Sequence, residues 1–86
     1  MEEKEIGQVS HYFGHISVAA IEVTDGPIAV GDKLHFKGHT TDFNMDVESI
    51  EIEHESVSEA NAGDSIGIKV AEKVRTGDKV FKVIGE

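Results

Sequence analysis

The sequence predicts an all-β domain whose six strands close into a Greek-key barrel. Apolar side chains recur at every second position along most of the chain, which is the period of a half-buried strand. Glycine-led turns separate these segments, and only one short stretch has a helical pattern. Six strands in 86 residues leave little room for an open sheet, so a closed sheet without unpaired edges is the expected solution.

The first two strands are expected to form a hairpin over residues 6–13 and 17–24. Along the first strand, Val9 and Phe13 share one parity and are expected to face the core. Tyr12 has the opposite parity. We therefore expect its ring to be exposed and available to contact a partner.

The third and fourth strands are expected over residues 33–37 and 43–54. The third alternates regularly between apolar and polar side chains, as a strand with one buried face does. In the fourth, the apolar positions change parity partway along, which indicates a β-bulge near Glu48 or Ser49. Residues 56–62 carry the helical pattern and are expected to form a single turn.

The last two strands are expected over residues 65–70 and 79–84. Gly67 lies inside the first of them, which is typical of a bend or of a close approach by another backbone. Residues 1–5 are mostly charged and are expected to be a tail, so that residues 6–86 form a single barrel domain.

A glycine–aspartate pair precedes three of the predicted strands. The pairs are Gly31 and Asp32, Gly63 and Asp64, and Gly77 and Asp78. Glycine readily adopts a positive φ, and an aspartate carboxylate accepts hydrogen bonds from nearby backbone amides. The three pairs are therefore predicted to be structural turns.

The charge balance is acidic, with 17 Asp and Glu against 8 Lys and Arg and a net charge of −9. Such a surface repels nucleic-acid phosphates, although the basic residues that gather toward the C-terminal end leave a local basic face open. The first residues do not have the pattern of a secretory signal, and no apolar run reaches the ~20 residues that a membrane span needs. We therefore expect a cytoplasmic protein with no membrane partner.

Four segments resemble the second, β-barrel domain of translation GTPases such as elongation factor Tu. They are residues 25–34 (Asp-Gly-Pro-Ile-Ala-Val-Gly-Asp-Lys-Leu), 47–52, 59–67 and 74–80. The resemblance implies the six-stranded barrel that these factors use to contact a GTPase domain, tRNA or the ribosome. The chain contains no phosphate-binding P-loop motif, so we expect it not to bind GTP.

Two further segments narrow the resemblance. Residues 11–13 and 36–43 resemble stand-alone translation elongation factor-like proteins and the C-terminal barrel of U32-family peptidases. The second of these likenesses implies a barrel that accompanies a peptidase domain.

The translation-factor resemblance also implies a candidate binding site. In aminoacyl-tRNA-binding factors, two acidic residues of this domain line the pocket for the terminal adenosine of tRNA, and they align with Glu51 and Asp64. The alternative is that Glu51 belongs to an exposed acidic stripe and that Asp64 is a turn residue. We favour the alternative, because aspartate is common in such turns and the net charge opposes RNA.

Neither a metal site nor a catalytic site is predicted. His11 and His15 are four residues apart, as are His35 and His39, but on a strand this spacing separates the side chains by about 13 Å. Such a pair cannot share a zinc ion unless a turn brings it together. No serine has the sequence context of an activated nucleophile. We expect no cofactor, no metal and no enzymatic activity.

The leading functional hypothesis is a non-catalytic docking module that binds a protein, tRNA or the ribosome. One alternative is an accessory or lid domain that acts in trans with a U32-type peptidase. Another is a structural barrel that associates with a second copy of itself.

Overall fold

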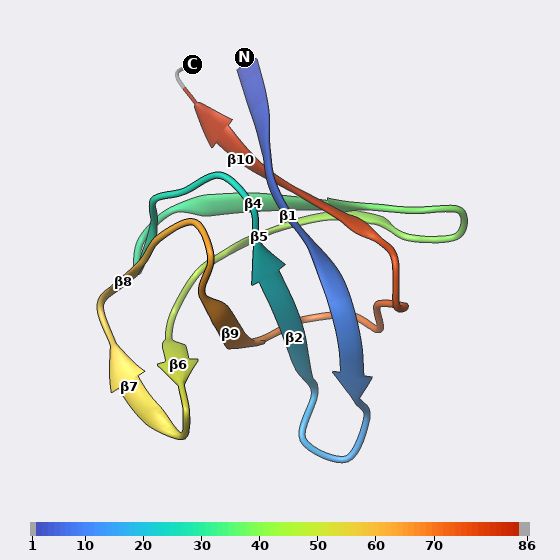
Figure 1. Cartoon of the computed structure of the whole chain (residues 1–86). Helices are drawn as coiled ribbons and strands as arrows, with labels where there is room; N and C mark the ends of the chain where they lie inside the picture. The colour runs from blue at the N-terminus through green and yellow to red at the C-terminus, as the bar shows by residue number, and fades with distance from the viewer. Residues whose placement is uncertain (1, 85–86) are drawn as a thin grey trace.

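The computed structural model describes residues 2–84 and contains ten β-strands and no helix within this range (Figure 1). The strands are β1 (Glu2–Phe13), β2 (Val18–Val23), β3 (Ile28–Ala29), β4 (Lys33–Lys37), β5 (Asp42–Asp46), β6 (Ile50–Ile52), β7 (Glu55–Val57), β8 (Glu59–Ala60), β9 (Ser65–Lys69) and β10 (Lys79–Ile84). The all-β fold class is therefore confirmed. Within the same range, no helix is long and apolar enough to cross a membrane.

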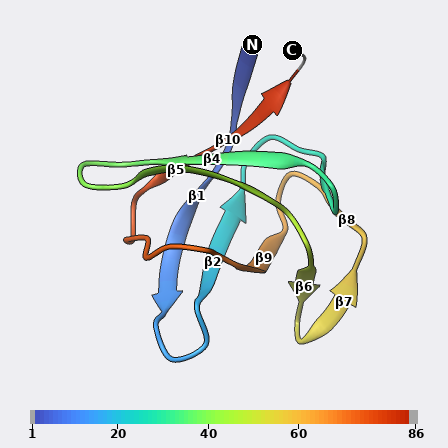
Figure 2. The ribbon, with the colours of Figure 1, turned by 180° about the vertical axis from the view of Figure 1, so that it is seen from behind.

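Eight of the strands form one antiparallel sheet in the order β5-β4-β10-β1-β2-β9-β6-β7. Strands β3 and β8 pair separately as a two-stranded sheet. Strands β1 and β10 lie side by side near the centre of the large sheet, which brings the two ends of the described chain together (Figures 1 and 2). The hairpin of β1 and β2 and the hairpin of β6 and β7 point toward the opposite end of the molecule.

The expected closure of six strands into a barrel is not seen. Strands β5 and β7 are the two edges of the sheet, and no ladder joins them within residues 2–84. The prediction assumed that a small domain removes its edges by closure. This chain instead keeps the edges short, with five residues in β5 and three in β7, and β5 begins and ends with the charged residues Asp42 and Asp46.

The curled sheet encloses an apolar core. Its buried side chains come from both halves of the sheet and from the loops. They are Ile6, Val9, Ala19, Ile21, Val23, Ile28, Leu34, Phe36, Val47, Ile50, Ala60, Ile66, Ile68, Val70, Val74 and Val80. In β2, β4 and β9 these residues alternate with more exposed ones, so the period of two predicted from the sequence is the observed packing pattern.

The parity prediction for β1 was wrong at its end. The register shifts between Val9 and His11, so Ser10 is an extra residue opposite β2, which is a β-bulge. Beyond the bulge Tyr12 turns inward, is half-buried and packs against the core, whereas Phe13 is 46% exposed. Tyr12 is therefore not the exposed ring that the unbroken alternation predicted.

The long strand predicted over residues 43–54 is two strands. The chain leaves β5 after Asp46 and enters β6 at Ile50, and the two strands pair with different neighbours. The change of parity marks this break rather than a bulge. Val47 lies in the link, and its N–H donates to the Asp32 carbonyl over 2.8 Å while its carbonyl accepts from Gly31 N–H over 2.9 Å.

Two further expectations differ from the structure. Residues 56–62 do not form a helical turn, because β7 and β8 occupy most of this stretch and pair with β6 and β3. Residues 2–5 are not a tail, because they continue β1 and pair with residues 81–84 of β10. Met1, Gly85 and Glu86 lie outside the described residues.

The three glycine–aspartate pairs build the same turn three times. The glycines have φ of 100° at Gly31, 95° at Gly63 and 95° at Gly77. In each turn one aspartate oxygen accepts a backbone N–H over 2.8 Å, from Ala29 to Asp32, from Asn61 to Asp64 and from Arg75 to Asp78. The carboxylate of each pair thus satisfies an amide of its own turn and holds the entry to the next strand.

Candidate functional site

A groove of about 350 Å³ lies on the outer face of the sheet where β2, β9 and β6 are neighbours. We call it the hairpin groove, because most of its lining residues belong to the β1–β2 and β6–β7 hairpins. These two hairpins point to the same end of the molecule (Figures 1 and 2). Its lining residues are Phe13, Ile16, Val18, Ala20, Glu51, Glu53, His54, Ser65, Ile66 and Gly67. The groove therefore has an apolar wall (Phe13 and Ile16), a low floor (Ala20 and Gly67) and an acidic wall (Glu51 and Glu53).

Two small residues make the floor low. Gly67 on β9 pairs with Ala20 on β2 and with Glu51 on β6, so one row of the sheet runs from Ala20 through Gly67 to the carboxylate. A Cβ atom added to Gly67 would meet only Val18 Cγ1, at an ordinary contact distance of 3.4 Å. The glycine is not required by its backbone conformation, and its missing side chain leaves the groove open.

The apolar wall is unusually exposed. Ile16 is 60% exposed at the tip of the β1–β2 hairpin, and its N–H donates to the Phe13 carbonyl over 3.3 Å. The Phe13 ring lies 4.4 Å from the His11 ring, measured between centroids. Single exposed apolar residues are common, but two on the rim of an apolar hollow form a continuous contact surface.

The acidic wall ends in a strained turn. Glu53 has a φ of 51° and His54 a φ of 67°, and together they join β6 to β7. Glycine or asparagine is favoured at both positions of such a hairpin turn. A left-handed conformation at another residue costs of order 1 kcal/mol, and this kind of strain clusters at functional sites. Such a conformation persists where the surrounding structure holds it, which here is the pairing of β6 with β7.

Acidic groups dominate the electrostatics of the groove. Glu51 and Glu53 line it, and no lysine or arginine does. Ser65, also on the lining, donates its hydroxyl hydrogen to Glu22 over 2.5 Å, which brings a third carboxylate to the edge. Lys69 follows Gly67 on β9 but lines a different hollow. The groove therefore suits an apolar group that is accompanied by a positive charge.

The two residues of the predicted adenosine pocket have separate positions. Glu51 is exposed and lies on the acidic wall of the groove. Asp64 is half-buried, does not line the groove, and accepts the Asn61 N–H in its own turn. The structure thus gives Glu51 a place at a candidate site and Asp64 a place in the backbone.

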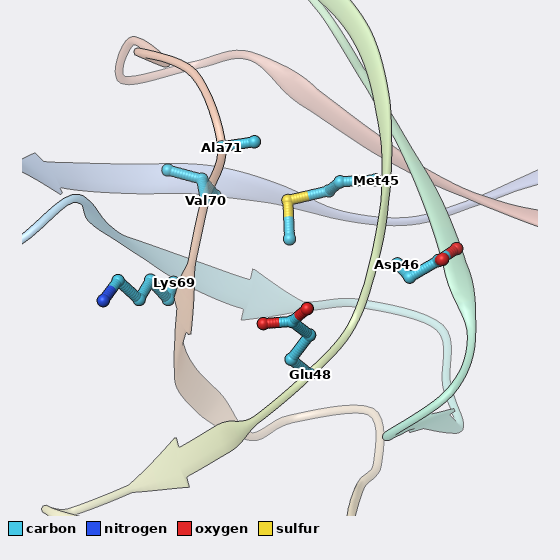
Figure 3. Close-up of a pocket in the computed structure, with 6 residues that line it drawn as sticks. All are labelled: Met45, Asp46, Glu48, Lys69, Val70 and Ala71. Carbon is cyan, nitrogen blue, oxygen red and sulfur yellow. The ribbon is translucent and has the colours of Figure 1, made fainter.

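A second hollow of about 310 Å³ lies between β5 and the end of β9. Met45, Asp46 and Glu48 line one side, and residues 69–71 line the other. Figure 3 shows the Met45 side chain extending into the space between the two segments. Because β5 is an edge of the sheet, this hollow lies beside a strand that has a neighbour on one side only.

The side chains of His35, Glu3 and Asp42 form a cluster on the other half of the sheet, which we call the His35 cluster. His35 on β4 contacts Glu3 through Nδ1 at 2.9 Å and Asp42 through Nε2 at 2.5 Å. The hydrogen bonds that the His35 ring donates to Glu3 and then to Asp42, together with the charges of these carboxylates, hold the pKa of His35 above its ordinary value of 6.5. The protonated ring donates from both nitrogens and so ties β4 to β1 and β5. Within residues 2–84, no group of three side chains is arranged to hold a metal ion.

Of the residues that line the groove, only Glu51 was identified from the sequence as a candidate site residue. The sequence predicted Phe13 to be buried and Tyr12 to be exposed, and the structure has the reverse, because the bulge at Ser10 leaves no signal in the apolar pattern. Gly67 was noted as a glycine inside a strand, but it was interpreted as a bend or a close backbone approach and not as a source of open space above the sheet. The pair Glu53 and His54 carried a signal in retrospect, because a short hairpin without glycine or asparagine is unusual.

No protein-family model matches this sequence. The chain is 36% identical over 78 residues to a collagenase of Porphyromonas gingivalis, and the match covers 90% of this chain and 22% of the collagenase. It is also 36% identical over 78 residues to an uncharacterised protease of Methanocaldococcus jannaschii, covering 90% of this chain and 19% of that protein. The chain thus spans about a fifth of the length of these curated relatives.

Two solved structures have the same fold along nearly their whole length. Both are of the C-terminal domain of a predicted U32 peptidase of Geobacillus thermoleovorans. One has a TM-score of 0.87 and 19% identity and covers 94% of this chain and 93% of that domain. The other, a selenomethionine variant, has a TM-score of 0.84 and 19% identity and covers 90% and 96%.

The expected resemblance to translation factors gains no support from these relatives and structures, whereas the expected resemblance to the barrel of U32 peptidases does. The chain therefore has the fold of a U32 peptidase C-terminal domain, and its sequence is similar to one segment of longer proteases.

Proposed function

We propose that this chain is a non-catalytic accessory domain that works with a U32-type peptidase and helps it to hold polypeptide. The observation that carries the proposal is the match of nearly the whole chain to about a fifth of two proteases, at 36% identity. A similar segment occurs in proteases of a bacterium and an archaeon, and in this chain it forms an all-β domain, which supports a role beside a peptidase domain.

The polar groups of the chain support an accessory role rather than a catalytic one. The Ser65 hydroxyl bonds to Glu22, and not to an imidazole that could activate it. The His35 ring is held by carboxylates on both sides, so neither nitrogen is free to take a proton from a substrate. The hairpin groove offers apolar and acidic groups that suit binding.

A chimeric collagenase tests the proposal. Three enzymes are compared: the P. gingivalis collagenase, a version without the matched segment, and a version in which this chain replaces that segment. We expect the truncated enzyme to lose about tenfold in gelatin cleavage, as when roughly 1.4 kcal/mol of substrate binding is removed. Its cleavage of a short peptide should be retained, and the chimera should recover most of the gelatin activity.

The same assay includes this chain alone, for which no cleavage of either substrate is expected. A chimera no better than the truncated enzyme would contradict the accessory role. Cleavage by the isolated chain would contradict its non-catalytic character.

A further inference from the structure

We propose that the hairpin groove binds a polypeptide segment that places an apolar side chain on the groove floor and a lysine or arginine against the acidic wall. This inference rests on the proposed function, because it names the kind of substrate segment that the accessory domain would hold. In this proposal, Phe13, Ile16 and Gly67 contact the apolar side chain of the bound segment. Glu51 and Glu53 contact its lysine or arginine.

The size and lining of the groove suit one apolar side chain. Its volume of about 350 Å³ is at the small end of the range typical of ligand pockets. Its floor lacks a side chain at Gly67, and its apolar wall carries Phe13 and Ile16, which are 46% and 60% exposed. An aliphatic or aromatic side chain laid on Gly67 would cover both exposed residues.

Charge complementarity favours a lysine or arginine as the second side chain that the bound segment places in the groove. Within the described residues, the lysines and histidine that form ion pairs all contact acids outside the groove. Glu51 and Glu53 appear in none of these pairs. Facing an apolar hollow, such carboxylates attract a cation and repel an acidic segment, so they supply discrimination as well as affinity.

The strained turn fixes the position of the acidic wall. Glu53 and His54 are held at positive φ by pairing of β6 with β7, where Ile52 pairs with Glu55. A rigid hairpin keeps the Glu53 carboxylate at the rim before a partner arrives, which lowers the ordering cost of binding.

Binding of three synthetic nine-residue peptides to the full chain tests this inference, measured by fluorescence anisotropy at low salt. The first peptide carries phenylalanine and, two positions later, lysine in a glycine–serine background. The second replaces the lysine by glutamate, and the third replaces the phenylalanine by alanine. We expect the first peptide to bind at least about tenfold more tightly than either of the others, and added salt to weaken it.

Variants of the chain locate the site. Gly67→Leu should abolish binding by filling the floor, and circular dichroism should show an unchanged fold, since the added Cβ meets nothing closer than 3.4 Å. The double variant Glu51→Gln and Glu53→Gln should weaken binding of the lysine peptide about fivefold. It should not weaken binding of the glutamate peptide. The matched control, Glu72→Gln, changes an exposed glutamate outside the groove and should have no effect.

Several results would overturn the inference. These are equal binding of the lysine and glutamate peptides, no binding of any peptide, or unchanged binding by the Gly67→Leu variant. Light scattering that shows a dimer which Ile16→Ser dissociates would assign the groove to a second copy of the chain instead. Tighter binding of a short RNA than of the lysine peptide would assign it to nucleic acid.

The outcomes also separate this inference from the proposed function. If the chimeric collagenase recovers activity while no peptide binds, only the assignment of the groove is wrong. If the peptides bind as expected while the chimera stays inactive, only the accessory role is wrong.

Discussion

The hairpin groove and the His35 cluster lie on opposite halves of one sheet and use their acidic residues in different ways. Around the cluster, Glu3 and Asp42 are bound to His35, and Lys82 on the neighbouring strand contacts Asp32 at 3.2 Å. In the groove, Glu51 and Glu53 contact none of the basic residues in the described ion pairs. The carboxylates around the cluster are engaged by basic side chains, whereas Glu51 and Glu53 form none of the ion pairs among the described residues.

The apolar residues of the two halves differ in the same way. Beneath the His35 cluster, Phe36 is fully buried and stacks on Phe43 with ring centroids 5.1 Å apart. At the groove, Phe13 and Ile16 project into solvent. The comparison teaches that one half of the sheet buries its aromatic side chains while the other leaves apolar side chains exposed, which is the arrangement expected if stability and the proposed binding depend on different regions. Matched substitutions in each half test this.

Truncating an apolar side chain in each half should give the largest contrast. Phe36→Ala removes a buried ring and should destabilise the fold by about 3–5 kcal/mol. Ile16→Ser changes a side chain that is 60% exposed and should shift the free energy of unfolding by no more than about 0.5 kcal/mol. Urea unfolding followed by circular dichroism measures both. A cost above about 1 kcal/mol for Ile16→Ser would break the comparison, because the groove wall would then be structural.

The pH dependence of stability should depend on the His35 cluster. Since the folded-state pKa of His35 is raised above 6.5, the cluster contributes its full stabilisation below pH 6.5 and loses it as the pH rises through that raised value. His35→Gln should cost about 1 kcal/mol at pH 6 and less at higher pH. Unfolding free energies measured from about pH 5.5 to 8.5 check this.

The exposed His39 provides the control for this measurement. His39→Gln should keep the wild-type loss of stability with rising pH, and His35→Gln should flatten it. If both variants keep the same slope, another group is responsible and the cluster is not the titrating element.

Relieving the strained turn should give the smallest effect and should sharpen the comparison. Glu53→Gly places glycine at a φ of 51° and should stabilise the fold by about 0.5–1 kcal/mol, since the left-handed conformation no longer carries a side chain. Glu55→Gly, two residues away in β7, should destabilise it by about as much. Thermal unfolding of the two variants measures the difference. A loss of stability in Glu53→Gly would mean that its side chain holds the hairpin together.

Local sequence signals predicted most of the elements and little of the site. The strands around Leu34 and Ile66 were predicted with nearly their observed bounds, because alternation and glycine-led turns are encoded within a few residues. Glu51 was selected only through the translation-factor resemblance, as part of an adenosine pocket. Phe13 was assigned to the core, because an extra residue at Ser10 reverses the parity without altering the composition of the strand.

The amino-acid sequence by itself determined the all-β class, the three glycine–aspartate turns and the side chains of most core positions, because each depends on neighbours a few residues away. Tertiary structure alone decided that the sheet stays open between β5 and β7, that Tyr12 turns inward and Phe13 outward, and that Ala20, Gly67 and Glu51 form one row. These features depend on strand register and on bulges, which are fixed by pairing between residues far apart in the chain, and the groove is a consequence of that pairing.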